Sequence, residues 1–256
     1  MPNAHAGQPK QPDALSRARV QYNLHQFDQA IATAETAARV PALADRARLV
    51  IGRSYLEKFR STGEAADLES GRNALRQVQV QSLPARERTE LLLGLGEGLY
   101  LDNLFGAAAD IFDSALAGDA DMDIRDSALD WWATSLDRLA QFQAPEDREA
   151  TYARIVERVQ RELQLEPAST AGAYWLAAAS RGLGGLQDAW DAAISGWVRA
   201  LLSPAGGPAL REDLERLVTI AIIPERAREM ADNPADREKA IASLKAEWEG
   251  VKSNWK

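Results

Sequence analysis

The fold of this chain is decided by the stretch LLLGLGEGLYLDNLFGAAADIFDSALAG, residues 91–118. Its apolar side chains recur at steps of three and four residues, which is the period of an amphipathic helix. The stretch divides into two such helices. Their large apolar positions are Leu92, Leu95 and Leu99 in the first half and Phe105 and Phe112 in the second.

Small residues accompany the large ones at Gly96, Ala108 and Ala115. The order of a large residue, Leu-Gly and an aromatic residue, followed by Ala, an aromatic residue and Ala on the partner helix, resembles the tetratricopeptide repeat. The resemblance implies antiparallel helical hairpins in which small residues lie at the close approach and large ones fill the space between neighbouring hairpins. It is specific for a fold and says little about function.

Weaker copies of this unit flank the clear one. Ile51-Gly52 with Tyr55 repeats the Leu-Gly-aromatic step, and Trp175 begins a copy whose second helix carries Trp197. Proline and glycine break the helical pattern at short intervals, and sustained β-type alternation is missing. We therefore expect an all-α chain: a flexible tail over residues 1–13, then a right-handed superhelix (solenoid) of about five helical hairpins over residues 14–204.

Residues 205–256 depart from the repeat. The helix that begins near Leu210 is expected to stop or kink at Pro224. The last helix follows Asn233-Pro234 and carries one narrow apolar seam. Its members are Ile241, Leu244, Trp248, Val251 and Trp255. The seam predicts a C-terminal cap that covers the open end of the stack, and a helix for homodimerisation or docking is the alternative.

The composition excludes several kinds of site. The 256 residues carry a net charge of −8, which argues against a general nucleic-acid binder. There is no cysteine, so disulfides and thiolate metal sites are excluded, and His5 and His25 are the only histidines. No apolar run approaches the roughly 20 residues of a membrane-spanning helix. The N-terminal Ala-His-Ala before Gly7 resembles a signal-peptide cleavage site, so an exported and a cytoplasmic protein both stay open.

Two motifs superficially suggest chemistry. GLGEGL, beginning at Gly94, resembles a phosphate-binding glycine run, but it lies within a helical repeat and lacks a preceding strand. DADMDIRDSALD, residues 119–130, has the aspartate spacing of a calcium loop. However, Ile124 and Asp130 stand where that loop needs glycine and glutamate. We interpret it as the start of a helix between repeats, and we predict no enzyme, no cofactor and no metal site.

The resemblance implies a concave groove lined by the first helices of successive hairpins. The matching positions are Arg46, Leu49, Arg53, Glu90, Leu93, Glu97, Tyr100 and Trp131. Trp132 shares a face with Leu129 and Leu136, so it is the expected core residue of the Trp-Trp pair. Basic residues in one unit and acidic residues in the next would give the groove a charge gradient, which suits an extended peptide carrying both signs.

We therefore expect a non-catalytic scaffold or adaptor that binds a protein or peptide partner in this groove. The alternative is an extracytoplasmic ligand-binding or accessory subunit of a transporter or envelope complex. A deep enclosed cavity lined by Trp131, Tyr100 or Trp175 would favour the alternative, and an open groove would favour the scaffold.

Overall fold

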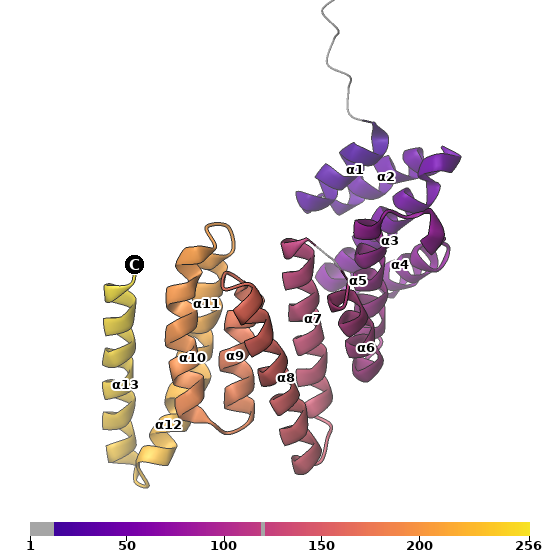
Figure 1. Ribbon diagram of the computed structural model, residues 1–256. Helices are drawn as coiled ribbons and strands as arrows, with labels where there is room; N and C mark the ends of the chain where they lie inside the picture. Colours follow the sequence, from indigo (N-terminus) through magenta and orange to yellow (C-terminus); the bar gives the residue numbers. More distant parts are fainter. Residues whose placement is uncertain (1–12, 119–120) are drawn as a thin grey trace, which may run out of the picture. The chain divides into compact units, whose positions relative to one another are not determined.

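A computed structural model describes residues 13–118 and 121–256, and over these residues the chain is all-α, without a strand (Figure 1). The expectation of an all-α helical array is confirmed. The predicted tail, apart from Asp13, and Asp119 of the aspartate-rich stretch lie outside the described residues. The chain forms two compact units: an N-terminal unit that ends at Asp121 and a C-terminal unit that begins at Met122.

The N-terminal unit consists of three helical hairpins. Its helices are α1 (Ala14–Asn23), α2 (Phe27–Ala38), α3 (Ala44–Thr62), α4 (Ala65–Arg76), α5 (Ala85–Leu101) and α6 (Phe105–Leu116). Short 3₁₀ turns, Pro41–Leu43 and Val80–Ser82, precede α3 and α5. The first helices of the hairpins, α1, α3 and α5, also pack against one another in series, as expected for stacked repeats.

The C-terminal unit consists of two further hairpins and a cap. Its helices are α7 (Met122–Ala140), α8 (Pro145–Leu165), α9 (Thr170–Gly182), α10 (Leu186–Arg199), α11 (Gly207–Leu217), α12 (Ile223–Met230) and α13 (Pro234–Asn254). A 3₁₀ turn, Ala200–Leu202, follows α10. Here α7, α9 and α11 pack in series. Among the described residues this makes five hairpins before the cap, the number that the repeat pattern predicts.

Three of the hairpins turn in the same way. His25, Asn103 and Gly184 each adopt a left-handed backbone, with φ of 58°, 60° and 80°. The N–H of the next residue donates in each case to the carbonyl five residues before it, as in a Schellman helix end. The repeat is therefore visible in the turns, although the residue types at these positions differ.

The close approach inside the clearest hairpin depends on Gly96. A Cβ atom at Gly96 would lie 2.5 Å from Cε1 of Phe112, which is fully buried on α6. Any larger residue would therefore push α5 away from α6. The structure thus explains why the repeat pattern combines glycine on one helix with an aromatic residue on the other.

The last helix is a cap. Leu244 and Trp248 are buried against α10 and α11, and the Trp248 ring lies 5.4 Å from that of Trp197. Ile241 and Val251 pack on the same core. Of the seam, only Trp255 is largely exposed, and the other large apolar side chains pack in the core of their own unit, as the cap requires. Homodimerisation through this helix stays a prediction.

The expected interruption at Pro224 takes a milder form. A π turn over Val218–Ile222 connects α11 to α12, and the chain stays helical through it. The proline ring would clash with the carbonyl four residues before it in a regular α-helix, and the wider π turn relieves that crowding. No helix in the described part of the chain is long and apolar enough to cross a membrane.

Candidate functional site

The N-terminal unit brings together five of the predicted groove residues, and three of them, Leu49, Arg53 and Glu90, line a small cleft. Arg46, Leu49 and Arg53 come from α3, and Glu90 and Glu97 come from α5. The cleft has a volume of about 180 Å³, and α1 closes it with side chains that the sequence did not single out. These are Arg19, Tyr22 and Asn23.

Arg46 and Arg19 are held by a buried carboxylate, Glu87. The Arg46 guanidinium donates to it from Nε at 2.8 Å and from Nη2 at 2.6 Å, and Nη2 of Arg19 lies 2.8 Å away. The bond to Glu87 raises the pKa of Arg46. Glu87 could have been found in the sequence because it precedes Glu90 by three residues and shares its helix face. The contact with Arg19 joins positions far apart in the chain and leaves no local signal.

Arg53 and Glu97 form a second pair deeper in this unit. Nη2 of Arg53 lies 3.7 Å from Oε1 of Glu97, and its guanidinium lies 5.0 Å from the centre of the Tyr22 ring. Burial raises the pKa of Glu97 to about 7, against the opposing effect of Arg53. Burial likewise raises the pKa of Tyr22. Glu97 therefore gains or loses its proton near neutral pH, whereas Arg53 stays charged.

Several predicted contact residues do not face a partner. Leu49, Leu93 and Glu97 are each only 1% exposed, because α3 and α5 pack directly against each other and share the face that was assigned to the groove. Tyr100 lies at the end of α5, where its ring packs edge-on against Phe105 at 5.2 Å. Leu49, Leu93 and Glu97 therefore present almost no surface to a ligand, although Leu49 reaches the wall of the small cleft.

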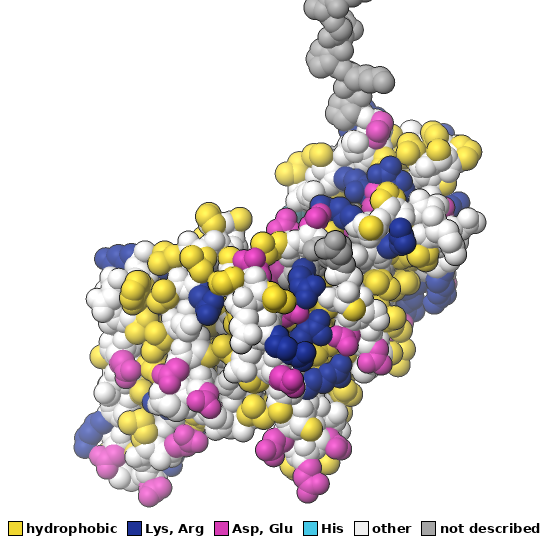
Figure 2. Space-filling model, viewed as in Figure 1, with side chains coloured by type: hydrophobic (Ala, Val, Ile, Leu, Met, Phe, Trp, Pro, Cys, Tyr) yellow, Lys and Arg dark blue, Asp and Glu magenta, His cyan; other side chains and the backbone are white. Residues whose placement is uncertain are grey.

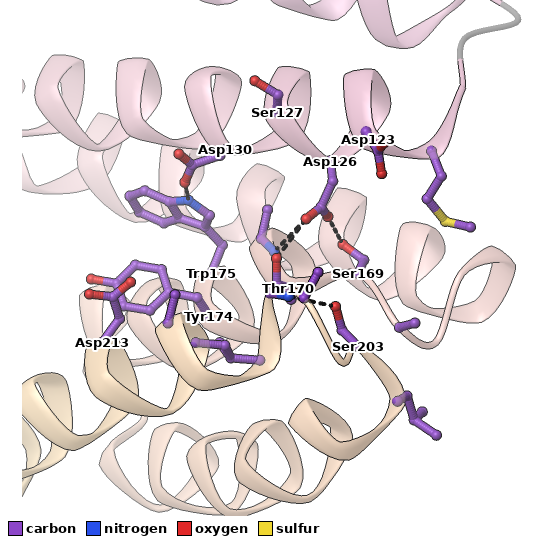
Figure 3. A pocket seen from close by; sticks show the side chains of 18 of the residues that line it. Asp123, Asp126, Ser127, Asp130, Ser169, Thr170, Tyr174, Trp175, Ser203 and Asp213 are labelled. Atoms are coloured by element: carbon purple, nitrogen blue, oxygen red, sulfur yellow. Dashed lines mark hydrogen bonds between the residues drawn. The ribbon is translucent and has the colours of Figure 1, made fainter. Parts of the chain in front are cut away.

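A larger cleft lies on the C-terminal unit (Figure 3). It has a volume of about 790 Å³ and is lined by α7, α9, α11 and the loop between α10 and α11. Within the part of the chain that the structure describes, every charged side chain that lines it is an aspartate: Asp123, Asp126, Asp130 and Asp213. Apolar side chains gather at the loop between α10 and α11 (Figure 2), where Leu201 and Leu202 are about half exposed.

Asp126 and Asp130 fix the floor of this cleft. Asp126 accepts hydrogen bonds from Oγ1 of Thr170 at 2.7 Å, from the backbone N–H of Ala171 at 3.3 Å and from the hydroxyl of Ser169 (Figure 3). It thereby caps the start of α9 from outside that helix. Asp130 accepts from Nε1 of the buried Trp175 at 2.8 Å. These two aspartates orient α9 against α7.

The cleft has a negative potential at its aromatic wall. Tyr174 on α9 is partly buried, and burial is the main reason why its pKa is raised. The charges of Asp213 and Asp130 raise that pKa further. Asp123 and Asp213 are exposed at the rim, and Asp213 pairs at 3.2 Å with the exposed Arg216 of its own helix.

Sequence reasoning placed the groove one residue away from this surface. Trp131 is partly buried and does not line the cleft, whereas Asp130 and Thr134 do. A step of one residue along a helix turns the side-chain direction by about 100°, so a side chain that lines the cleft is followed by one that points away from it. Trp132 is 1% exposed, as expected of the core member of the pair.

Residues 122–130 of the aspartate-rich stretch form the start of α7. The helix begins at Met122, and Asp126 and Asp130 are engaged by α9. Within residues 13–118 and 121–256, no three Asp, Glu, His or Cys side chains come together in a way that could hold a metal ion.

The fold and these clefts together define a class: a helical-hairpin protein whose first helices line surface clefts. Comparison of the chain with family models, with curated proteins and with solved structures finds no match.

Proposed function

We propose that this chain is a tetratricopeptide-like, non-catalytic interaction protein that binds a peptide segment in the cleft of its C-terminal unit. The observation that carries the proposal is the cleft itself, which is open and is built on α7, α9 and α11, three helices that pack in series. A rigid helical wall holds polar and aromatic groups in fixed positions, and an open cleft gives a chain room to enter.

The nature of the lining supports peptide binding over the accessory-subunit alternative. Small-ligand sites enclose most of the ligand among apolar and aromatic side chains. Here Trp175 is buried and its indole N–H is bonded to Asp130, so Tyr174 is the aromatic side chain that faces the cleft most openly. The remaining lining is mainly short polar and aliphatic side chains, which suits a partner with its own backbone and side chains.

Selection of peptides by the full chain tests the proposal. The probe is a phage-displayed library of random peptides, selected on the immobilised wild-type chain. Peptides that bind are then tested against Ala209→Trp, in which an exposed residue that lines the cleft on α11 becomes bulky. The matched control is Ala242→Trp, on the exposed side of α13 and away from the cleft.

We expect selected peptides to bind wild type and Ala242→Trp equally and to bind Ala209→Trp at least tenfold more weakly. The reason is steric, because the indole fills space that the peptide needs. The proposal is overturned if no peptide is enriched, or if both tryptophan variants retain the same affinity for every enriched peptide.

A further inference from the structure

The charge of the large cleft points to the kind of peptide that it binds. Among the described residues its charged lining consists of aspartates alone, without a lysine or arginine side chain. Asp123 and Asp213 stand at the rim on α7 and α11, and both are exposed. A cationic side chain that enters therefore meets carboxylates without displacing a basic residue from the lining, whereas an anionic chain is repelled.

The same carboxylates are distributed over the cleft and do not converge. In the described residues they form no cluster that could surround one metal ion. Asp213 pairs with Arg216, but both side chains are more than half exposed, and exposed pairs of this kind exchange partners at little cost. Carboxylates that stand apart on α7 and α11 suit two separate cations carried by one chain.

The distance between these helices sets the spacing of the two cations. Helices that pack in series are about 8–10 Å apart, so α7 and α11, which both contact α9, are separated by about 16–20 Å at most. An extended chain advances about 3.3 Å per residue. A step of four residues therefore spans about 13 Å and a step of six about 20 Å, which stays within this limit, and an even number keeps both side chains on the same face.

An extended segment also fits the available space better than a helix. Three turns of helix span about 16 Å and, with a diameter of about 10 Å, occupy roughly 1,250 Å³. The cleft offers about 790 Å³. The apolar loop at its edge, with the exposed Leu202, and the Tyr174 ring provide a surface for one apolar side chain between the two cations.

We infer that the cleft takes an extended peptide in which two lysines or arginines, four to six residues apart, flank an apolar residue on the same face. This inference rests on the proposed function and adds the chemistry of the partner. The cations meet the rim aspartates of α7 and α11, and the apolar side chain packs between Tyr174 and the loop that follows α10.

Fluorescence anisotropy with synthetic peptides tests the inference. The probes are fluorescein-labelled peptides of one length: one with lysines four residues apart and leucine midway, one with the same residues and adjacent lysines, and one with glutamate in place of lysine. A fourth, longer peptide carries its lysines eleven residues apart, the spacing of three helical turns. The full chain is titrated into each at low and at high salt.

We expect the first peptide to bind most tightly, and its affinity to fall as salt rises. The double substitution Asp123→Asn with Asp213→Asn should weaken its binding about 2- to 30-fold. The control, Glu149→Gln with Glu238→Gln, changes the net charge equally at exposed sites outside the cleft and should leave affinity unchanged.

Other results would overturn the inference. If the glutamate peptide binds as tightly as the first lysine peptide, or if the double asparagine variant binds the first peptide as tightly as wild type does, charge plays no part in recognition. If the longest peptide binds more tightly than the first, the cleft binds a helix and the inference of an extended segment is wrong. If phage selection gives cleft-dependent peptides without paired basic residues, this inference fails and the proposed function stands. If it gives no cleft-dependent peptide at all, the proposed function itself fails.

Discussion

A single methyl group at Gly96 should test whether the close approach of α5 and α6 holds the N-terminal unit together. The perturbation is Gly96→Ala, and its matched control is Gly98→Ala, two residues along the same helix. At Gly96 the new Cβ would lie 2.5, 2.6 and 2.9 Å from three carbons of the Phe112 ring. At Gly98 it would meet only Cγ of Arg72, at 3.9 Å.

The expected magnitudes follow from two opposing effects. Alanine in a helix interior is favoured over glycine by about 0.5–1 kcal/mol, because alanine loses less conformational freedom on folding than glycine does. Overpacking a buried site costs about 1–3 kcal/mol, and Phe112 is too enclosed to move aside freely. We expect Gly96→Ala to lower the free energy of unfolding by about 1–2 kcal/mol and Gly98→Ala to raise it by about 0.5–1 kcal/mol.

Urea titration followed by far-UV circular dichroism measures both effects. All seven tryptophans come after residue 121, so their fluorescence follows the C-terminal unit and serves as an internal reference. Adding Phe112→Leu to Gly96→Ala should restore part of the loss, because a smaller side chain makes room for the methyl group. The reasoning is refuted if Gly96→Ala is as stable as wild type, or if both alanines stabilise equally.

Three further substitutions test other parts of the structure. The raised pKa of Glu97 means that the folded chain binds the proton of Glu97 more tightly than the unfolded chain does. Wild type should therefore lose up to about 3 kcal/mol of stability relative to Glu97→Gln as pH rises from about 4.5 to 7. Urea titrations across that range measure this loss, and free energies of unfolding that change with pH in the same way for both chains would contradict it. Trp248→Ala should cost about 3–5 kcal/mol and Trp255→Ala under 1 kcal/mol in thermal unfolding, because only the first is buried. Asp126→Ala should destabilise the C-terminal unit by about 1–2 kcal/mol through loss of the cap on α9, and hydrogen exchange at the start of α9 should rise.

The sequence predicted most of the fold because the signals that form hairpins are local. The period of the apolar residues and the breaks at Pro41, Pro145 and Pro167 act within a few residues, and the helices end near them. Trp132 was assigned correctly to the core for the same reason, since its face is set by neighbours on one helix. The sequence did not predict the shared left-handed turn, because the three residues that form it, His25, Asn103 and Gly184, have little in common as residue types.

The candidate site was harder to predict because it is assembled from separate helices. Leu49 and Leu93 follow the expected groove spacing, but whether such a face meets solvent depends on how closely the neighbouring first helix packs. The sequence assigned Trp131 to the groove, whereas the neighbouring residue Asp130 lines the cleft. A repeat pattern predicts where a helix lies in the chain, but it defines the rotation of the helix about its axis only to within about one residue. The pairing of Glu87 with Arg19 was equally out of reach from local sequence.

By itself, the sequence determined an all-α chain of five hairpins with a terminal cap, because each helix carries its own apolar stripe and its own end signals. It also determined the acidic character of the 119–130 stretch. Only the tertiary structure decided what that acidity does: Asp126 and Asp130 accept hydrogen bonds from α9, and Asp123 stands exposed at the rim of a cleft that Asp213 of α11 also lines. The reason is that burial and pairing of a side chain are properties of the contacts between helices, and a local pattern holds no information about which neighbour a face will meet.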